Sequence, residues 1–282
     1  MAGLGLALSA SLCWGVADFL GGLQARRNAL LYVMLVSQGI GLAVLLAGVA
    51  ASGDGAPRIS RLLPAALGGL GGIAGLTAFY RALAIGTMSI VAPIAATGVC
   101  VPVVVGIAGG EHPEVVQLVG ILAATVGVVL ASREPNADLG SHGASAARAS
   151  IVLALVAAVG FGGYLVGLRS SARADVTWAL LAARIVEVGA IAIVYAVLRP
   201  KRPVGKASLV PLCVMGVLDL SATGLYALAT RHGLLSVVAV AASLYPLVTV
   251  TLARTLLGER VRRIQEVGIA AAPAGVAMIA AA

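Results

Sequence analysis

The chain has 282 residues, of which 60% are apolar and only 11% are charged, and its mean hydropathy is +1.06. Soluble domains carry about 25% charged residues, so this composition excludes a soluble globular fold and indicates an integral membrane protein. The net charge is +8, but the basic residues lie singly or in short loop clusters without interleaved aromatic residues. This pattern excludes a nucleic-acid surface and suits contact with the anionic lipid of a cell membrane.

In chain order, ten apolar segments approach the length of about 20 residues that a helix needs to cross a bilayer. The predicted spans are 3–22, 29–50, 62–82, 87–107, 114–132, 150–168, 176–198, 209–229, 234–256 and 264–281. The first has no basic leader and is predicted to be a span, not a signal peptide. The predicted fold class is therefore an all-α, multi-pass membrane protein with ten transmembrane helices.

The second half of the sequence repeats the first at a displacement of 147 residues. The pairs include Trp14 and Phe161, Pro64 and Pro211, Gly69 and Gly216, Phe79 and Tyr226, and Ser89 and Ser236, with Glu111 on Glu259 one residue later. We therefore divide the chain into a first repeat at 1–132, a linker at 133–149 and a second repeat at 150–282. Five spans per repeat is an odd number, so the second repeat enters the membrane from the opposite side. Inverted repeats are typical of secondary transporters, whose substrate site lies at the repeat interface.

Three short motifs add a family resemblance. They are Trp14-Gly15, the stretch from Tyr80-Arg81-Ala82 to Ala92-Pro93, and Leu257-Gly258-Glu259-Arg260 followed by Gln265 and Gly268. In this order the chain resembles the EamA branch of the drug/metabolite transporter superfamily over essentially its whole length. The first half keeps only Gly110-Glu111 of the third motif, and Val240 stands where the first half has Pro93. The resemblance implies a ten-helix secondary carrier, many of which export amino acids, other metabolites or toxic compounds.

Polar side chains inside the spans indicate where a substrate would bind, because a charge at the bilayer centre costs roughly 2.5–3.5 kcal/mol on insertion scales. Asp219, Thr223 and Tyr226 share one helical face. The candidate cavity residues are Trp14, Asp18, Gln38, Thr97, Arg184, Glu187, Asp219, Thr223, Tyr226 and Ser243. Asp219 and Glu187 are also the candidates for carrying a proton.

Each candidate has a structural alternative. Asp219 either lines a cavity or belongs to a polar seam between helices. Arg184 either holds a substrate carboxylate through its forked guanidinium or is neutralised by Glu187, three residues away on the same face. Trp14 either stacks on a substrate or fills a helix interface, and Asp18 either faces the cavity or reaches interfacial water.

These features predict a secondary-active, alternating-access transporter that exports a small polar or amino-acid-like metabolite, with proton coupling through a carboxylate. The alternatives are a carrier of lipophilic cations, a membrane-embedded enzyme and a non-transporting scaffold. The expected partners are a small-molecule substrate and membrane lipid, a homodimer is left open, and no nucleic acid or cofactor is expected. No metal site is expected either, because His112, His142 and His232 lie in predicted loops. Orientation stays open: the basic loops place the termini outside, whereas the resemblance implies termini inside.

Overall fold

The computed structural model describes residues 2–53, 55–86, 88–131, 141–198 and 209–257, with the isolated positions 263–264, 267–268, 271, 274–275 and 278. This part of the chain is helical and contains no strand. The helices are α1 (Ala2–Arg27), α2 (Leu30–Ser52), α3 (Ile59–Ile85), α4 (Met88–Ala96), the 3-10 turn η1 (Thr97–Val99), α5 (Cys100–Ala108), α6 (Val115–Ala131), α7 (Ser141–Ala172), α8 (Val176–Leu198), α9 (Leu209–His232), α10 (Leu235–Ala242) and α11 (Tyr245–Leu257).

Nine of the predicted spans fall on these helices, but several boundaries differ. Helix α1 continues to Arg27, and α7 begins at Ser141, inside the stretch that was predicted to be a linker. Both extensions carry polar residues that a hydropathy window does not count as part of a span. Most of the tenth predicted span, 264–281, lies outside the described residues.

Two predicted spans are each divided by a break. The span 87–107 consists of α4, η1 and α5, and the span 234–256 consists of α10 and α11 with Ser243 and Leu244 between them. A proline follows each break, Pro102 in α5 and Pro246 in α11. Proline has no N–H to donate to the residue four positions earlier and crowds that carbonyl, which loosens the helix there.

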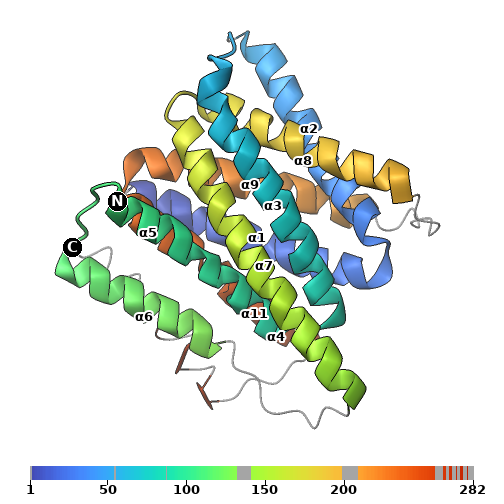
Figure 1. Cartoon of the computed structure of the whole chain (residues 1–282). Coiled ribbons are helices and arrows are strands. Elements are labelled where there is room, and N and C mark those ends of the chain that lie inside the picture. The colour runs from blue at the N-terminus through green and yellow to red at the C-terminus, as the bar shows by residue number, and fades with distance from the viewer. Residues whose placement is uncertain are drawn as a thin grey trace.

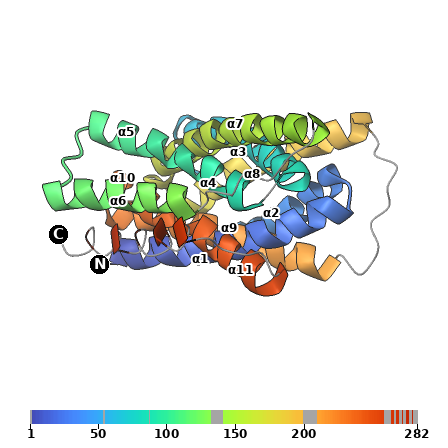
Figure 2. The same ribbon diagram turned by 90° about the horizontal axis from the view of Figure 1, so that it is seen from below.

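The two halves pack against each other through two equivalent pairs of helices. Helix α3 packs along α7, and α1 packs along α9; α3 and α7 lie side by side in both views (Figures 1 and 2). The repeat displacement relates α1 to α7 and α3 to α9, so these two contacts are equivalent. Glycines allow the close approach: a Cβ on Gly71 of α3 would lie 3.3 Å from the carbonyl oxygen of Gly160 in α7.

The surface of the bundle is apolar and its interior is built of small residues. Large aliphatic side chains are exposed along the outer faces of α3, α6, α7 and α8, whereas much of the buried core is alanine. Seven of the described helices are long and apolar enough to cross a membrane, counting α10 and α11 as one. Outward-facing aliphatic side chains over close-packed small residues are the arrangement expected in lipid.

Candidate functional site

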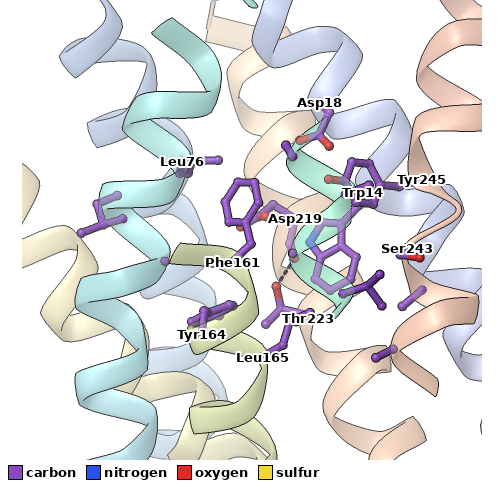
Figure 3. Close-up of a pocket in the computed structure, with 18 of the residues that line it drawn as sticks. Trp14, Asp18, Leu76, Phe161, Tyr164, Leu165, Asp219, Thr223, Ser243 and Tyr245 are labelled. Carbon is purple, nitrogen blue, oxygen red and sulfur yellow. Dashed lines mark hydrogen bonds between the residues drawn. The ribbon is translucent and has the colours of Figure 1, made fainter. Parts of the chain in front are cut away.

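A cavity of about 90 Å³ lies inside the bundle, between helices of both halves (Figure 3). One water needs roughly 10–15 Å³ of such space, so the cavity has room for several waters or for one small organic solute. Its walls come from α1, α2, α3, α4 and η1 of the first half and α7 to α11 of the second. The lining residues are Trp14, Asp18, Gln38, Gly72, Ile73, Leu76, Ala95, Ala96, Gly98, Val99, Phe161, Tyr164, Leu165, Arg184, Glu187, Asp219, Thr223, Ala239, Ala242, Ser243 and Tyr245.

Many of the lining residues are repeat counterparts of one another. The pairs 147 residues apart that both line the cavity are Trp14 with Phe161, Asp18 with Leu165, Gly72 with Asp219, Leu76 with Thr223, Ala95 with Ala242, Ala96 with Ser243, and Gly98 with Tyr245. The cavity therefore lies where the two repeats meet. Its chemistry is not symmetric, because the polar member of a pair comes from the first repeat at Asp18 and from the second at Asp219, Thr223 and Ser243.

An ion network occupies one wall of the cavity. Both terminal guanidinium nitrogens of Arg184 in α8 donate to Oδ2 of Asp219 in α9, each at 3.0 Å, and Nη1 lies 3.3 Å from Oε2 of Glu187. The amide of Gln38 in α2 also donates to Oδ2 of Asp219, at 3.4 Å. Arg184 is 3% exposed and Glu187 is 4% exposed, whereas the Asp219 side chain is 18% exposed, so the network is buried on the α8 side and partly open at Asp219. Arg184 therefore lies between two carboxylates: Glu187, the partner that the neutralisation alternative named, and Asp219, which the sequence did not suggest as its partner.

A glycine makes room for this network. A Cβ on Gly72 of α3 would lie 3.0 Å from the ring of Tyr164 and 3.2 Å from Oε1 of Glu187. Both distances are too short for a side chain to fit without displacing a neighbour. The absence of a side chain at Gly72 therefore lets Tyr164 and Glu187 reach the cavity beside α3.

Another part of the cavity wall carries an acid among aromatic rings. Asp18 and Trp14 lie four residues apart on one face of α1, and the Trp14 ring stands edge-on to Tyr245 with centroids 6.5 Å apart. Phe161 and Tyr164 of α7 line the other side (Figure 3). Asp18 is 8% exposed, and among the described residues no group pairs with it or donates a hydrogen bond to it.

One end of the cavity is closed by aromatic and ionic contacts. Trp14 packs on Tyr226, with ring centroids 5.9 Å apart, and Tyr226 interacts electrostatically with Arg169 and Glu111 beyond it. We call Glu111, Arg169, Leu235 and Ser236 the Glu111 cluster. Arg169 lies one helical turn past the lining residue Leu165, so the cluster lies outside the cavity.

The Glu111 cluster joins the first repeat to the second. Oε1 of Glu111 accepts from Nη2 of Arg169 at 2.9 Å and from the backbone N–H of Leu235 at 2.8 Å. Oε2 accepts from the backbone N–H and the hydroxyl of Ser236, each at 3.0 Å. The carboxylate therefore caps the N-terminus of α10, where helix N–H groups are unpaired and the dipole favours a negative charge. Gly110 supports this geometry, because its φ of +90° suits glycine best.

The structure brings eight of the ten predicted candidates to the cavity: Trp14, Asp18, Gln38, Arg184, Glu187, Asp219, Thr223 and Ser243. The other two do not line it. Thr97 lies in η1 and its hydroxyl donates to the carbonyl of Ile94 at 2.6 Å. Tyr226 is fully buried behind Trp14, because the face that it shares with Asp219 and Thr223 continues past the end of the cavity.

The structure corrects the predicted positions of Asp18 and of two histidines, and it shows how the Thr223 hydroxyl is used. Asp18 is buried and lies about two and a half turns before the end of α1, because that helix extends past the predicted span. The Thr223 hydroxyl donates to the carbonyl oxygen of Asp219 at 2.8 Å (Figure 3), which is a bond within α9. His142 and His232 lie in the terminal turns of α7 and α9 and not in loops. In the described part of the chain no group of His, Cys, Asp and Glu residues is arranged to hold a metal ion.

Three aromatic lining residues and Glu111 were not among the candidates predicted from the sequence. Phe161 could have been found, because it is the repeat counterpart of Trp14, and Tyr164 shares its helical face. Tyr245 follows the helix break, which hydropathy does not reveal. Glu111 could have been chosen because both halves keep a Gly-Glu pair, at Gly110-Glu111 and Gly258-Glu259.

Comparisons with known proteins identify the family. A family model described as "EamA-like transporter family" matches twice, at residues 1–133 and 148–281. A solved structure titled "Crystal structure of protein" is similar in fold, with a TM-score of 0.76 and 16% identity, and the match covers 98% of this chain and 95% of that one. None of the curated proteins matches. The two family matches span both repeats, so this chain belongs to the EamA-like transporter family.

Proposed function

We propose that this protein is a secondary-active carrier of the cell membrane that exports a small polar organic solute by alternating access. The observation that carries the proposal is the cavity at the meeting point of the two repeats, lined by repeat counterparts and by buried charges. Equivalent halves can exchange conformations, so that a site between them opens first to one side of the membrane and then to the other. In this proposal the chain has ten transmembrane helices, arranged as two inverted repeats of five.

The broken helices and the Glu111 cluster support this mechanism. Discontinuous helices at the site are a recurring feature of secondary transporters, and the breaks after α4 and after α10 both border the cavity. The Glu111 cluster fastens the loop after α5 to the N-terminus of α10 across the repeat boundary. Opening that end of the cavity would require these contacts to separate.

Proton coupling is part of the proposal. Asp219 and Glu187 share Arg184, so protonation of one carboxylate would weaken its bond to the guanidinium and free that wall of the cavity to rearrange. Asp219 is the better placed of the two, because it bonds across helices to α8 and α2. Glu187 pairs with Arg184 within its own helix.

The test is a solute screen in proteoliposomes that contain the full chain, with empty liposomes as the blank. A mixture of amines, amino acids, organic acids and neutral polar metabolites is loaded, and export is followed with and without a pH gradient. A solute that leaves only the protein-containing vesicles, saturably and faster with the gradient, supports the proposal. If no solute in any class moves faster than in empty liposomes, the carrier function is wrong.

Asp219→Asn tests the coupling. We expect this variant to lose the response of export to the pH gradient, because an amide cannot exchange a proton in this range. The control is Asp175→Asn: Asp175 caps α8 through a 2.8 Å bond from the N–H of Trp178, lies outside the cavity, and asparagine caps equally well. A wild-type response to the gradient in Asp219→Asn would exclude Asp219 as the proton carrier.

A further inference from the structure

Asp18 is a buried carboxylate that the ion network of the cavity leaves unbalanced. It is 8% exposed and borders the cavity, yet no described residue pairs with it. Its electrostatic neighbours among the described residues are Asp219, which is also an acid, and the neutral Tyr80 and Tyr245. An ionised carboxylate removed from water is costly unless something compensates its charge. Among the described residues none supplies that positive charge, so Asp18 is either protonated or compensated by a cation that enters the cavity.

The surroundings of Asp18 suit an organic cation. Trp14 lies one turn away on the same face of α1, and Tyr245 stands edge-on to it. Phe161 and Tyr164 face these rings from the other side of the cavity (Figure 3). The faces of aromatic rings attract ammonium groups, and they also give the apolar part of a solute a surface to pack on.

The described residues that line the cavity offer no free positive group to an anionic substrate. Among its lining residues the basic one is Arg184, against three acids, Asp18, Glu187 and Asp219. Both terminal nitrogens of Arg184 are used by Asp219, and one of them also lies beside Glu187. A substrate carboxylate would have to displace these internal partners, whereas an ammonium group would meet Asp18, an acid with which no described residue pairs.

We propose that the cavity binds a small organic ammonium ion that carries no carboxylate, with its charged nitrogen at Asp18 and its apolar part against Trp14 and Phe161. This inference rests on the proposed carrier function. It narrows the substrate of the carrier from small polar solutes, zwitterionic amino acids included, to organic amines that carry a single positive charge. Asp18 supplies the charge and the rings supply the packing surface.

Four probes with one phenyl skeleton test the charge requirement: phenethylamine, phenylalanine, 3-phenylpropanoate and 2-phenylethanol. Radiolabelled phenethylamine is equilibrated by dialysis with the full-length protein in lipid nanodiscs, and the other three are added as competitors. We expect saturable binding of phenethylamine and at least about tenfold weaker competition by each of the other probes, since a charge-assisted contact is lost or a carboxylate is buried.

Two substitutions at Asp18 test the site. Asp18→Asn keeps the shape and removes the charge, and should weaken phenethylamine binding at least about tenfold. Asp18→Glu keeps the charge and should retain most of the binding. The matched control is Asp175→Asn, an acid-to-amide change outside the cavity, which should bind like the wild type. Size-exclusion profiles identify any variant that does not fold, and the comparison of the four probes on the wild type needs no variant at all.

Each outcome bears on the proposal. Tight phenethylamine binding that depends on Asp18 supports it. Equal binding by Asp18→Asn, tighter binding of phenylalanine or phenylpropanoate, or no binding of phenethylamine overturns it. The carrier function fails separately: if amines bind at Asp18 but no solute crosses proteoliposomes, the site stands without transport. If other solutes are transported and no amine binds, the transport function stands and the cargo assignment is wrong.

Discussion

Replacing Glu111 by glutamine removes one negative charge from the contact that fastens the two repeats together. The carboxylate accepts four contacts of 2.8–3.0 Å, from Arg169, from two backbone N–H groups of α10 and from the Ser236 hydroxyl. Glutamine keeps one oxygen, but its NH₂ group would face donors at the Oε2 position. The Ser236 hydroxyl can rotate away, whereas the Ser236 N–H cannot.

The size of the effect follows from these contacts. An unsatisfied N–H costs about 1–3 kcal/mol, and the loss of a negative charge at a helix N-terminus costs about 0.3–1 kcal/mol more. Removing the charge that faces Arg169 adds to this cost, because the Arg169 and Glu111 side chains are only 20% and 9% exposed and water screens the pair weakly. We expect Glu111→Gln to lower the free energy of unfolding by about 2–4 kcal/mol. If the cluster forms only when this end is closed, the ratio of closed to open states falls by about 30- to 700-fold.

The two consequences are measured in parallel. Denaturant titration in mixed micelles gives the free energy of unfolding. Opening is followed by labelling Ala239→Cys, a buried lining position of α10, with a maleimide reagent after the native residues Cys13, Cys100 and Cys213 have been replaced by alanine. Glu111→Gln should label faster than its parent.

Glu114→Gln is the matched control. Glu114 lies in the same loop but its side chain is exposed, so its loss of charge should change the unfolding free energy by less than about 0.5 kcal/mol. The reasoning is refuted if the Glu111 and Glu114 variants unfold alike and label at the same rate. Faster labelling with unchanged stability would instead show that the cluster holds the closed state without stabilising the fold.

Two further substitutions test the packing of the bundle. Arg184→Lys keeps the charge but not the planar fork that reaches both Asp219 and Glu187, so the free energy of unfolding should fall by about 1–3 kcal/mol. The control is Arg173→Lys at an exposed position, which should leave the free energy of unfolding unchanged. Equal values for the two variants would mean that the network does not stabilise the fold. Gly69→Ala would place a Cβ 2.8 Å from the carbonyl oxygen of Ala183 and should lower the free energy of unfolding by about 1–3 kcal/mol, because it forces α3 and α8 apart. Gly39→Ala, with open space around it, should be neutral or stabilising in the same denaturant titration.

The sequence by itself determined the class of protein and most of its helices. Apolar segments of bilayer length are visible without a structure, because lipid requires each crossing segment to satisfy its own backbone and to present apolar side chains. The repeat and its motifs led to the EamA-like family, which the family model confirms. Intramembrane charge was also informative, because a buried charge needs either a partner or a cavity, and both Asp219 and Glu187 border one.

Only the tertiary structure decided how those charges are used. Arg184 could have paired with Glu187 alone or held a substrate; the crossing of α8 and α9 brings Asp219 to it, and no spacing along one helix encodes that crossing. No described residue donates a hydrogen bond to Asp18, although its place on α1 borders the same cavity as the ion network. Tyr226 shares a helical face with Asp219 but lies behind Trp14. A helix periodicity assigns residues to a face, whereas the packing of neighbouring helices decides whether that face meets a cavity, a partner or a closed end.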